Sequence, residues 1–216
     1  QLAEEIVRRQ QTEALLVEAL REGADLVGGC TYADPDPSEH VRRIFALGER
    51  FGTAVDFHVD FDLDPEGADL PAIIEETARR SYRGRVACGH VTKLAAFAAG
   101  DLDHVAAPLR DLGIGIIALP ATDLFLLGRE ARARGLSAMA PVMQLAARGV
   151  PAAIATNNVL NPFTPYGDAN LLRMANLCAN VTQLALGSEM AGAFDLIGRG
   201  PAAILRRSHG VETGNS

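Results

Sequence analysis

The feature that most constrains the fold is a regular alternation of helical and extended segments. Five apolar segments expected to form strands begin near residues 24, 53, 85, 114 and 151, and helical segments separate them. The starts lie about 30 residues apart, which is the length of a βα unit. Residues 114–119 and 150–155 are apolar at nearly every position, as in parallel strands that are buried on both faces. The sequence therefore predicts an α/β protein.

Two α/β architectures compete, an open doubly wound sheet and a (β/α)8 barrel. No glycine-rich phosphate loop follows a predicted strand, and Gly113-Ile114-Gly115 precedes one, which is the wrong place for a dinucleotide fingerprint. Polar residues end three of the strands, which favours the barrel. A closed barrel takes eight strands and usually about 250 residues. The 216 residues are therefore expected to form a single domain, residues 1–216, that is part of a barrel.

Helical spacing and turn signals predict the remaining elements. Residues 1–20 are expected to lie in a charged helix, and the absence of an initiating Met suggests a processed or truncated product. Ser38 is expected to cap the second helix. The other helical segments are predicted at residues 12–22, 38–50, 70–81, 101–112, 137–148 and 168–186, with two short pieces before Gly210.

Composition narrows the class of function. A net charge of −7 argues against nucleic acid and anionic membranes as partners, because both require clustered Lys and Arg. Three scattered cysteines are too few for a disulfide framework or a Cys-rich zinc site. No apolar run approaches the roughly 18 residues of a membrane span, and no secretory signal is visible. We therefore expect a cytoplasmic protein.

Two histidines end successive predicted strands. His58 closes a segment in which apolar and polar residues alternate, and His90 closes the next one. In a parallel barrel, both imidazoles would point toward one rim, where they could bind a metal ion. The alternative is that each is a hydrogen-bonded histidine at a strand end. The other histidines, His40, His104 and His209, are expected at the surface.

Carboxylates and amides accumulate at the same strand ends. Asp60 and Asp62 could act as general acid or base, or could serve as caps and turn residues before Pro65. Asp123 could bind substrate, or could cap the helical segment that follows it. Asn157 and Asn158 follow the fifth strand in a loop rich in Asn and Pro, which could be a site wall or a rigid turn.

Three segments together resemble landmarks of a known family. They are residues 89–95 (GHVTKLA), residues 119–124 (LPATDL) with 128–129 (GR), and residues 157–167 (NNVLNPFTPYG). Their order and spacing resemble the cytosine deaminase-like branch of the amidohydrolase superfamily over almost the whole chain. The resemblance implies a metal-dependent (β/α)8 barrel that hydrolyses C–N bonds of small cyclic amides or amidines. It places this chain at about strands four to eight of such a barrel.

The resemblance also implies roles for particular residues. His58 and His90 correspond to the histidines of the fifth and sixth strands, which bind metal or polarise the substrate. The family's proton-shuttling glutamate corresponds to Phe61, and its metal-binding aspartate corresponds to Asn157. Phe61 cannot carry a proton, and Asn157 offers only a neutral carbonyl. Asp60 or Asp62 could replace the shuttle if a bulge re-aims the strand end.

Two hypotheses follow for function. The first is a hydrolase of a non-peptide C–N bond, with Asp60, Asp62 and Asn157 as catalytic residues, Asp123 and Asn158 as substrate contacts, and His58 and His90 as ligands of a divalent metal ion, favouring zinc or iron. The second is a catalytically silent relative that binds a small ring compound or serves in assembly. In either case we expect a homo-oligomer or a partner N-terminal segment.

Overall fold

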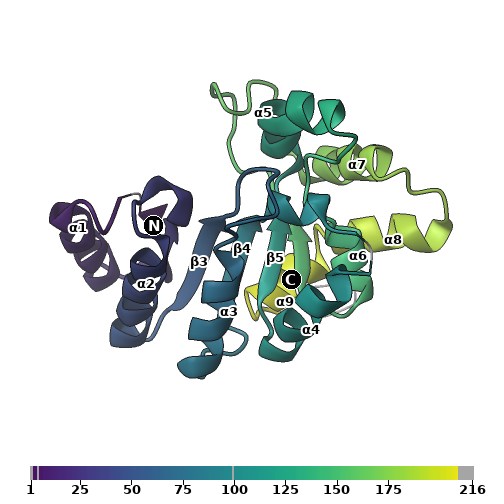
Figure 1. The fold of residues 1–216 in the computed structure, drawn as a ribbon. Helices are drawn as coiled ribbons and strands as arrows, with labels where there is room; N and C mark the ends of the chain where they lie inside the picture. The colour runs from purple at the N-terminus through teal and green to yellow at the C-terminus, as the bar shows by residue number, and fades with distance from the viewer. Residues whose placement is uncertain (1, 4, 99, 209–216) are drawn as a thin grey trace.

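The structure, a computed structural model, describes residues 2–3, 5–98 and 100–208, and a parallel sheet forms its centre (Figure 1). The sheet has six strands in the order β1-β2-β3-β4-β5-β6, so each strand pairs with its neighbours in the sequence. The five predicted strands are present, and the fold is a partial (β/α)8 barrel, as predicted. The strands are β1 (Leu2–Ala3), β2 (Leu26–Cys30), β3 (Ala54–Val59), β4 (Val86–His90), β5 (Gly115–Ala118) and β6 (Ala152–Ile154).

Helices connect the strands and cover one face of the sheet. Figure 1 shows α2, α3 and α4 in front of the strands, and α9 on the opposite side. The helices are α1 (Gln10–Arg21), α2 (Pro37–Phe51), α3 (Leu70–Arg79), α4 (Leu102–Leu112), α5 (Pro120–Ala133), α6 (Val142–Ala147), α7 (Leu171–Val181), α8 (Gly187–Asp195) and α9 (Arg199–Ile204). Two short 3-10 helices, η1 (Thr31–Ala33) and η2 (Thr92–Ala96), follow β2 and β4.

The helix predictions were correct in kind but wrong at several boundaries. The first residues contain the short strand β1 rather than helix, and α1 begins only at Gln10. The cap of α2 is Asp36, whose carboxylate accepts the Glu39 amide, and not Ser38. The predicted helix at 168–186 ends at Val181, because the next residues turn and Gln183 has a φ of +56°. Residues 137–141 precede α6 and are not helical.

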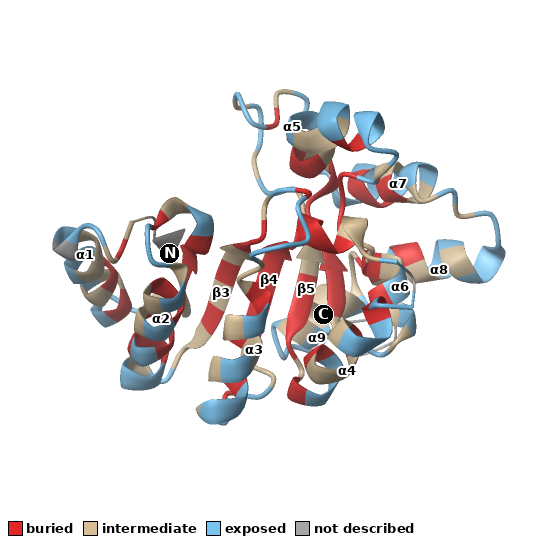
Figure 2. Ribbon diagram, viewed as in Figure 1, coloured by how far each residue is buried: buried red, intermediate tan, exposed pale blue. Residues whose placement is uncertain are grey.

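The face of the sheet that meets the helices forms the core. Val55, Phe57 and Val59 on β3 are buried in this core, and Figure 2 shows the neighbouring strands β4 and β5 mostly in the red of buried residues. Burial of an aliphatic or aromatic side chain contributes about 1.5–3 kcal/mol. The alternate residues of β3, Asp56 and His58, therefore face the other side of the sheet, which becomes the inner side of the partial barrel.

The inner side is lined by small residues around one acid. Asp56 lies in register with Gly28 on one side and Ala87 on the other, and Ala87 is in register with Gly115. Ile204 of α9 packs over Gly115, where a Cβ would lie 2.8 Å from its side chain. The C-terminal helix therefore covers part of the inner face next to Asp56.

The expectation that His40 lies at the surface was wrong. His40 is fully buried on α2, and its Nε2 points at Gly29 of β2. A Cβ at Gly29 would lie 1.9 Å from that nitrogen, so only glycine leaves room for the ring. His104 is exposed, as expected, and His209 lies outside the described residues.

Gly29→Ala is expected to destabilise the fold by about 1–3 kcal/mol, because the new methyl group overlaps the buried His40 ring. The matched control is Gly128→Ala in α5, where a Cβ would meet nothing within 4 Å. That control is expected to stabilise slightly, since alanine is the better helix former. Urea unfolding of both variants measures the difference, and equal midpoints would contradict the account of Gly29.

Candidate functional site

Two imidazoles meet at the carboxyl edge of the sheet. His58 Nδ1 lies 3.1 Å from His90 Nε2, and the ring centroids are 4.9 Å apart at 73°. The two residues come from neighbouring strands, β3 and β4. The sequence therefore predicted correctly that these side chains come together at one edge.

A left-handed backbone turn makes this meeting possible. His90 is in register with Val59, whose side chain points into the core, so a regular strand would direct His90 to the helices as well. His90 instead has a φ of +70°, and Val91 follows at +49°. Such conformations cost of order 1–3 kcal/mol each for residues other than glycine. The strand therefore ends in a strained turn that directs the His90 ring toward His58.

Asp123 binds the ring nitrogen of His90 that does not face His58. Its Oδ1 lies 2.7 Å from His90 Nδ1, and its Oδ2 accepts the backbone amide of Leu119 at 3.2 Å. Asp123 is fully buried within α5 and does not line the pocket beside the histidines. Of the two roles considered for Asp123, the structure favours the structural one, because its carboxylate bonds the first turn of α5.

Burial sets the charge state of His58. Desolvation, with a smaller contribution from His90, lowers the pKa of His58 to about 4, so His58 is neutral at physiological pH. Burial raises the pKa of Asp123, and hydrogen bonds from His90 and Leu119 oppose that rise. When Asp123 is ionised it accepts the Nδ1 proton of His90. The bond between His58 Nδ1 and His90 Nε2 requires a proton on one of these two nitrogens, and a metal ion bound to both would take the place of that proton.

The histidines line a pocket of about 610 Å³ with aromatic and amide neighbours. The two amides are Asn157 and Asn158, for whose loop the sequence left a site wall or a rigid turn open, and the Asn157 amide lies 3.4 Å from Thr122 Oγ1. Phe163, from the same loop, also lines the pocket, whereas sequence reasoning did not assign Cys30, Tyr32, Thr122 or Leu126 to the site, although all four line it. Cys30 ends β2 and Tyr32 follows it, so their position at the carboxyl end of a strand was the signal that could have identified them.

The structure does not bring Asp60 and Asp62 into this pocket. Asp60 has a φ of +55°, and its buried carboxylate accepts the amides of Asp69 and Leu70 at the start of α3. Burial raises the pKa of Asp60 to about 6. Asp62 Oδ1 accepts Lys93 Nζ at 2.7 Å. Both acids therefore serve the loop after β3, as caps and turn residues.

Phe61 lies between these two acids in the sequence, and unlike them it lines the pocket. Its ring centroid lies 4.3 Å from that of His90 and 6.0 Å from that of Tyr32. Thr92 holds the backbone on both sides of it, since Thr92 Oγ1 bonds to the carbonyls of Asp60 and Asp62 at 2.9 and 2.8 Å. The turn at Asp60 thus directs an aromatic ring into the site and turns the flanking carboxylates away.

Lys93 also binds the loop after β3, and its contacts together with those of Thr92 are called the clamp below. Its ammonium group, with 8% of the side chain exposed, donates to Asp62 Oδ1 and to the carbonyls of Asp64 and Glu66 at 2.7, 2.8 and 3.0 Å. Thr92 and Lys93 both belong to η2, which directly follows His90 and Val91. The loop that carries Phe61 is therefore bound to the turn that positions His90.

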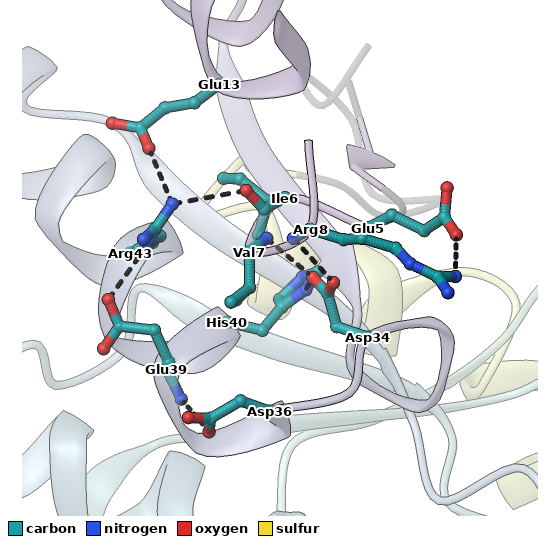
Figure 3. A network of polar contacts seen from close by, with 10 residues as sticks. All are labelled: Glu5, Ile6, Val7, Arg8, Glu13, Asp34, Asp36, Glu39, His40 and Arg43. Atoms are coloured by element: carbon teal, nitrogen blue, oxygen red, sulfur yellow. Dashed lines mark hydrogen bonds and ion pairs between the residues drawn. The ribbon is translucent and has the colours of Figure 1, made fainter. Parts of the chain in front are cut away.

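A second buried network lies behind Tyr32 (Figure 3). Asp34 ends the η1 turn that carries Tyr32, and its carboxylate accepts the amides of Val7 and Arg8 and bonds His40 Nδ1 at 2.6 Å. Burial acts to raise the pKa of Asp34, but these hydrogen bonds outweigh it and the pKa is lowered. The network therefore ties the Tyr32 turn to α2 and to the segment that follows β1.

The donor set fits part of a metal site. Two nitrogen ligands of one tetrahedral ion, each bound at about 2.0–2.1 Å, lie roughly 3.3 Å apart, which is close to the 3.1 Å between His58 and His90. Among the described residues, however, no group of three or more His, Cys, Asp and Glu could hold a metal ion. This part of the chain therefore supplies at most two imidazole ligands.

Comparison with known proteins identifies relatives of the whole chain. A pterin deaminase of Rhizobium rhizogenes is 32% identical over 200 residues, which cover 89% of this chain and 44% of that protein. An N-isopropylammelide isopropyl amidohydrolase of a Pseudomonas species is 21% identical over 212 residues, or 94% of this chain and 48% of that protein. The chain thus spans about half the length of the curated relatives it matches. No family model matches it.

A solved structure agrees with the fold. The 5-methylcytosine deaminase of Klebsiella pneumoniae, liganded with 5-fluorocytosine, superposes with a TM-score of 0.89 at 22% identity, over 99% of this chain and 54% of that one. The sheet and these relatives define a partial (β/α)8 barrel of the amidohydrolase type. The chain belongs to the amidohydrolase superfamily, so the resemblance of its motifs is confirmed. Deaminases of this superfamily are generally dependent on a divalent metal ion.

Lys93→Met is expected to destabilise the protein by about 2–4 kcal/mol, because three acceptors lose a buried ammonium donor. The control Arg134→Met removes an exposed pair with Glu130 and is expected to change stability by less than about 1 kcal/mol. Chemical unfolding followed by circular dichroism measures both. A Lys93→Met midpoint equal to that of the control would contradict the clamp.

Asp56→Asn is expected to stabilise the protein at alkaline pH. Burial raises the pKa of Asp56 from 3.8 to about 6, so the folded state binds this proton more tightly than the unfolded chain. Stability contributed by the proton is fully present below about pH 4 and is lost as pH rises through about 6. The variant should therefore gain about 2 kcal/mol at pH 8 and little at pH 4.

The control is Asp25→Asn, since Asp25 lines the same cavity on the inner face of the sheet as Asp56 but is exposed. Because Asp25 is exposed, this substitution is expected to change stability by less than about 0.5 kcal/mol. Thermal unfolding of the three proteins between pH 4 and 8 provides the measurement. A gain for Asp56→Asn that is the same at both pH values would contradict the raised pKa.

Proposed function

We propose that the protein containing this chain is a hydrolase that cleaves a C–N bond of a small cyclic amide or amidine, as a deaminase does. The observation that carries the proposal is the contact of His58 and His90 inside a pocket with an aromatic and amide lining. The names of the two curated relatives support this reaction type, since one is a pterin deaminase and the other an amidohydrolase.

In this proposal His58 and His90 are two nitrogen ligands of a divalent metal ion, with zinc or iron as the favoured metals. The remaining ligands would come from outside the described residues. Such an ion, when bound, would polarise a water molecule or a ring carbonyl. Asp123 contributes by fixing the orientation and protonation of His90, because its carboxylate accepts the Nδ1 proton.

The other pocket residues bind the substrate ring. Asn157 and Asn158 present amide groups to the polar edge of a heterocycle, and Phe61 excludes water from the His90 side. Hydrolysis joins the water oxygen to the ring carbon, breaks the C–N bond and releases ammonia or an amine. Asp60 and Asp62 are bound elsewhere in the structure, so we assign the proton transfers of this reaction to neither of them.

A second candidate is a relative that binds a ring compound without hydrolysing it. The observation that favours it is the absence of a carboxylate among the described residues that line the pocket. Metal analysis separates the two candidates: near-stoichiometric zinc, iron, manganese or cobalt in the purified protein supports the hydrolase. A folded protein without bound metal, and without turnover when metal is added, supports the binder.

The remaining proposals concern partners and location. We propose a small-molecule substrate and either a homo-oligomer or a partner N-terminal segment that completes the barrel; sedimentation analysis of the purified protein tests the first. No helix among the described residues is long and apolar enough to cross a membrane. A cytoplasmic location stays a prediction.

His58→Ala and His90→Ala are each expected to reduce kcat/KM for ammonia release by about 10²–10⁴-fold, because each removes a group that acts on the reacting centre. His104→Ala is the control, since His104 is an exposed histidine on α4. The assay measures ammonia from cytosine, pterin and ammelide with the metal-loaded protein. Retention of full activity by either strand-end variant would exclude the proposed site.

A further inference from the structure

The aromatic wall of the pocket carries an inference that rests on the proposed small-ring site and deepens it. Tyr32 and Phe61 lie near the starts of successive βα loops, just after β2 and β3, and line the same cavity as His90. Phe163 joins them from the loop after β6, and its ring is 56% exposed. Besides the two imidazoles, the polar groups of the cavity include the amides of Asn157 and Asn158 and the hydroxyl of Thr122.

This distribution suits a flat ring with a polar edge. Aromatic side chains stack on planar π systems with centroids about 4.5–7 Å apart. The faces of such a ring would contact the aromatic wall, and its N–H and C=O groups would meet the amides. A puckered saturated ring of the same size could use the amides but could not stack.

Buried polar contacts hold both rings before any ligand arrives. The backbone on either side of Phe61 is fixed by Thr92 Oγ1, and Lys93 binds the rest of that loop. The turn that carries Tyr32 is fixed by the fully buried pair of Asp34 and His40. A ligand that stacks there therefore pays little conformational entropy to order the wall.

We propose that Phe61 is a specificity-determining residue that selects planar, conjugated heterocycles over saturated rings with the same polar edge. The selection acts by stacking, with Tyr32 and the His90 ring as neighbours of Phe61. It applies to binding and is independent of whether the ring is subsequently hydrolysed.

The test uses two matched pairs of probes. The first pair is uracil and dihydrouracil. The second pair is a benzo-fused uracil and its counterpart in which the fused carbocycle is saturated. Within each pair the urea and imide edge is the same. Dissociation constants are measured by calorimetry on the purified protein. The planar member is expected to bind about 5- to 10-fold more tightly than the saturated one.

Three variants locate the preference. Phe61→Leu keeps an apolar side chain of similar reach but removes the π face, so the ratio of the two dissociation constants should fall below about 2-fold. Phe61→Trp should restore the ratio. Phe125→Leu, which changes an exposed aromatic residue of α5 that does not line the pocket, should leave it unchanged. Circular dichroism checks that each variant is folded.

The outcomes separate this inference from the proposed function. The inference would be overturned if Phe61→Leu left the ratio of the two dissociation constants unchanged, including by weakening both probes equally. It would also be overturned if the parent protein bound neither probe. Absence of ammonia release from every heterocycle, combined with a ratio that depends on Phe61, would overturn the hydrolase and leave the inference standing.

Discussion

The backbone conformation at the end of β4 is the constraint on which the site depends. A regular strand would place His90 among the core residues beside Val59, on the opposite side of the sheet from His58. The left-handed turn at His90 and Val91 moves the imidazole to the inner side, where it meets His58 at 3.1 Å. Strain of this kind persists only where the surroundings fix it, and here Asp123 binds the ring from behind.

The same principle recurs at the neighbouring strand ends. Asp60 after β3 and Asn157 after β6 also have positive φ values, of 55° and 63°. At Asp60 the turn separates two kinds of side chain, since the aromatic ring of Phe61 enters the pocket and the carboxylates bind α3 and Lys93. Buried polar contacts thus stabilise loops whose conformations the strands alone would not produce, and the loops in turn position the pocket wall.

Hydrophobic patterning predicted the elements but not the directions of individual side chains. The five longer strands, their parallel order and the meeting of His58 with His90 follow from the period of the sequence and from the rule that strand ends meet at one edge. The burial of His40 could not be predicted from its helix, α2, because it depends on the space that Gly29 leaves on strand β2. Likewise, the sequence offered Asp60 as a possible catalyst, and only its φ of +55° reveals that its carboxylate turns to α3.

The strand order has a consequence for how the protein is made. Every pair of neighbouring strands is also consecutive in the sequence, from β1 to β6. Each new βα unit that leaves the ribosome therefore finds its partner already synthesised, and the sheet can grow at one edge without waiting for distant segments. Until the next unit emerges, the growing edge carries unpaired backbone groups, which are able to pair with the edge of another chain.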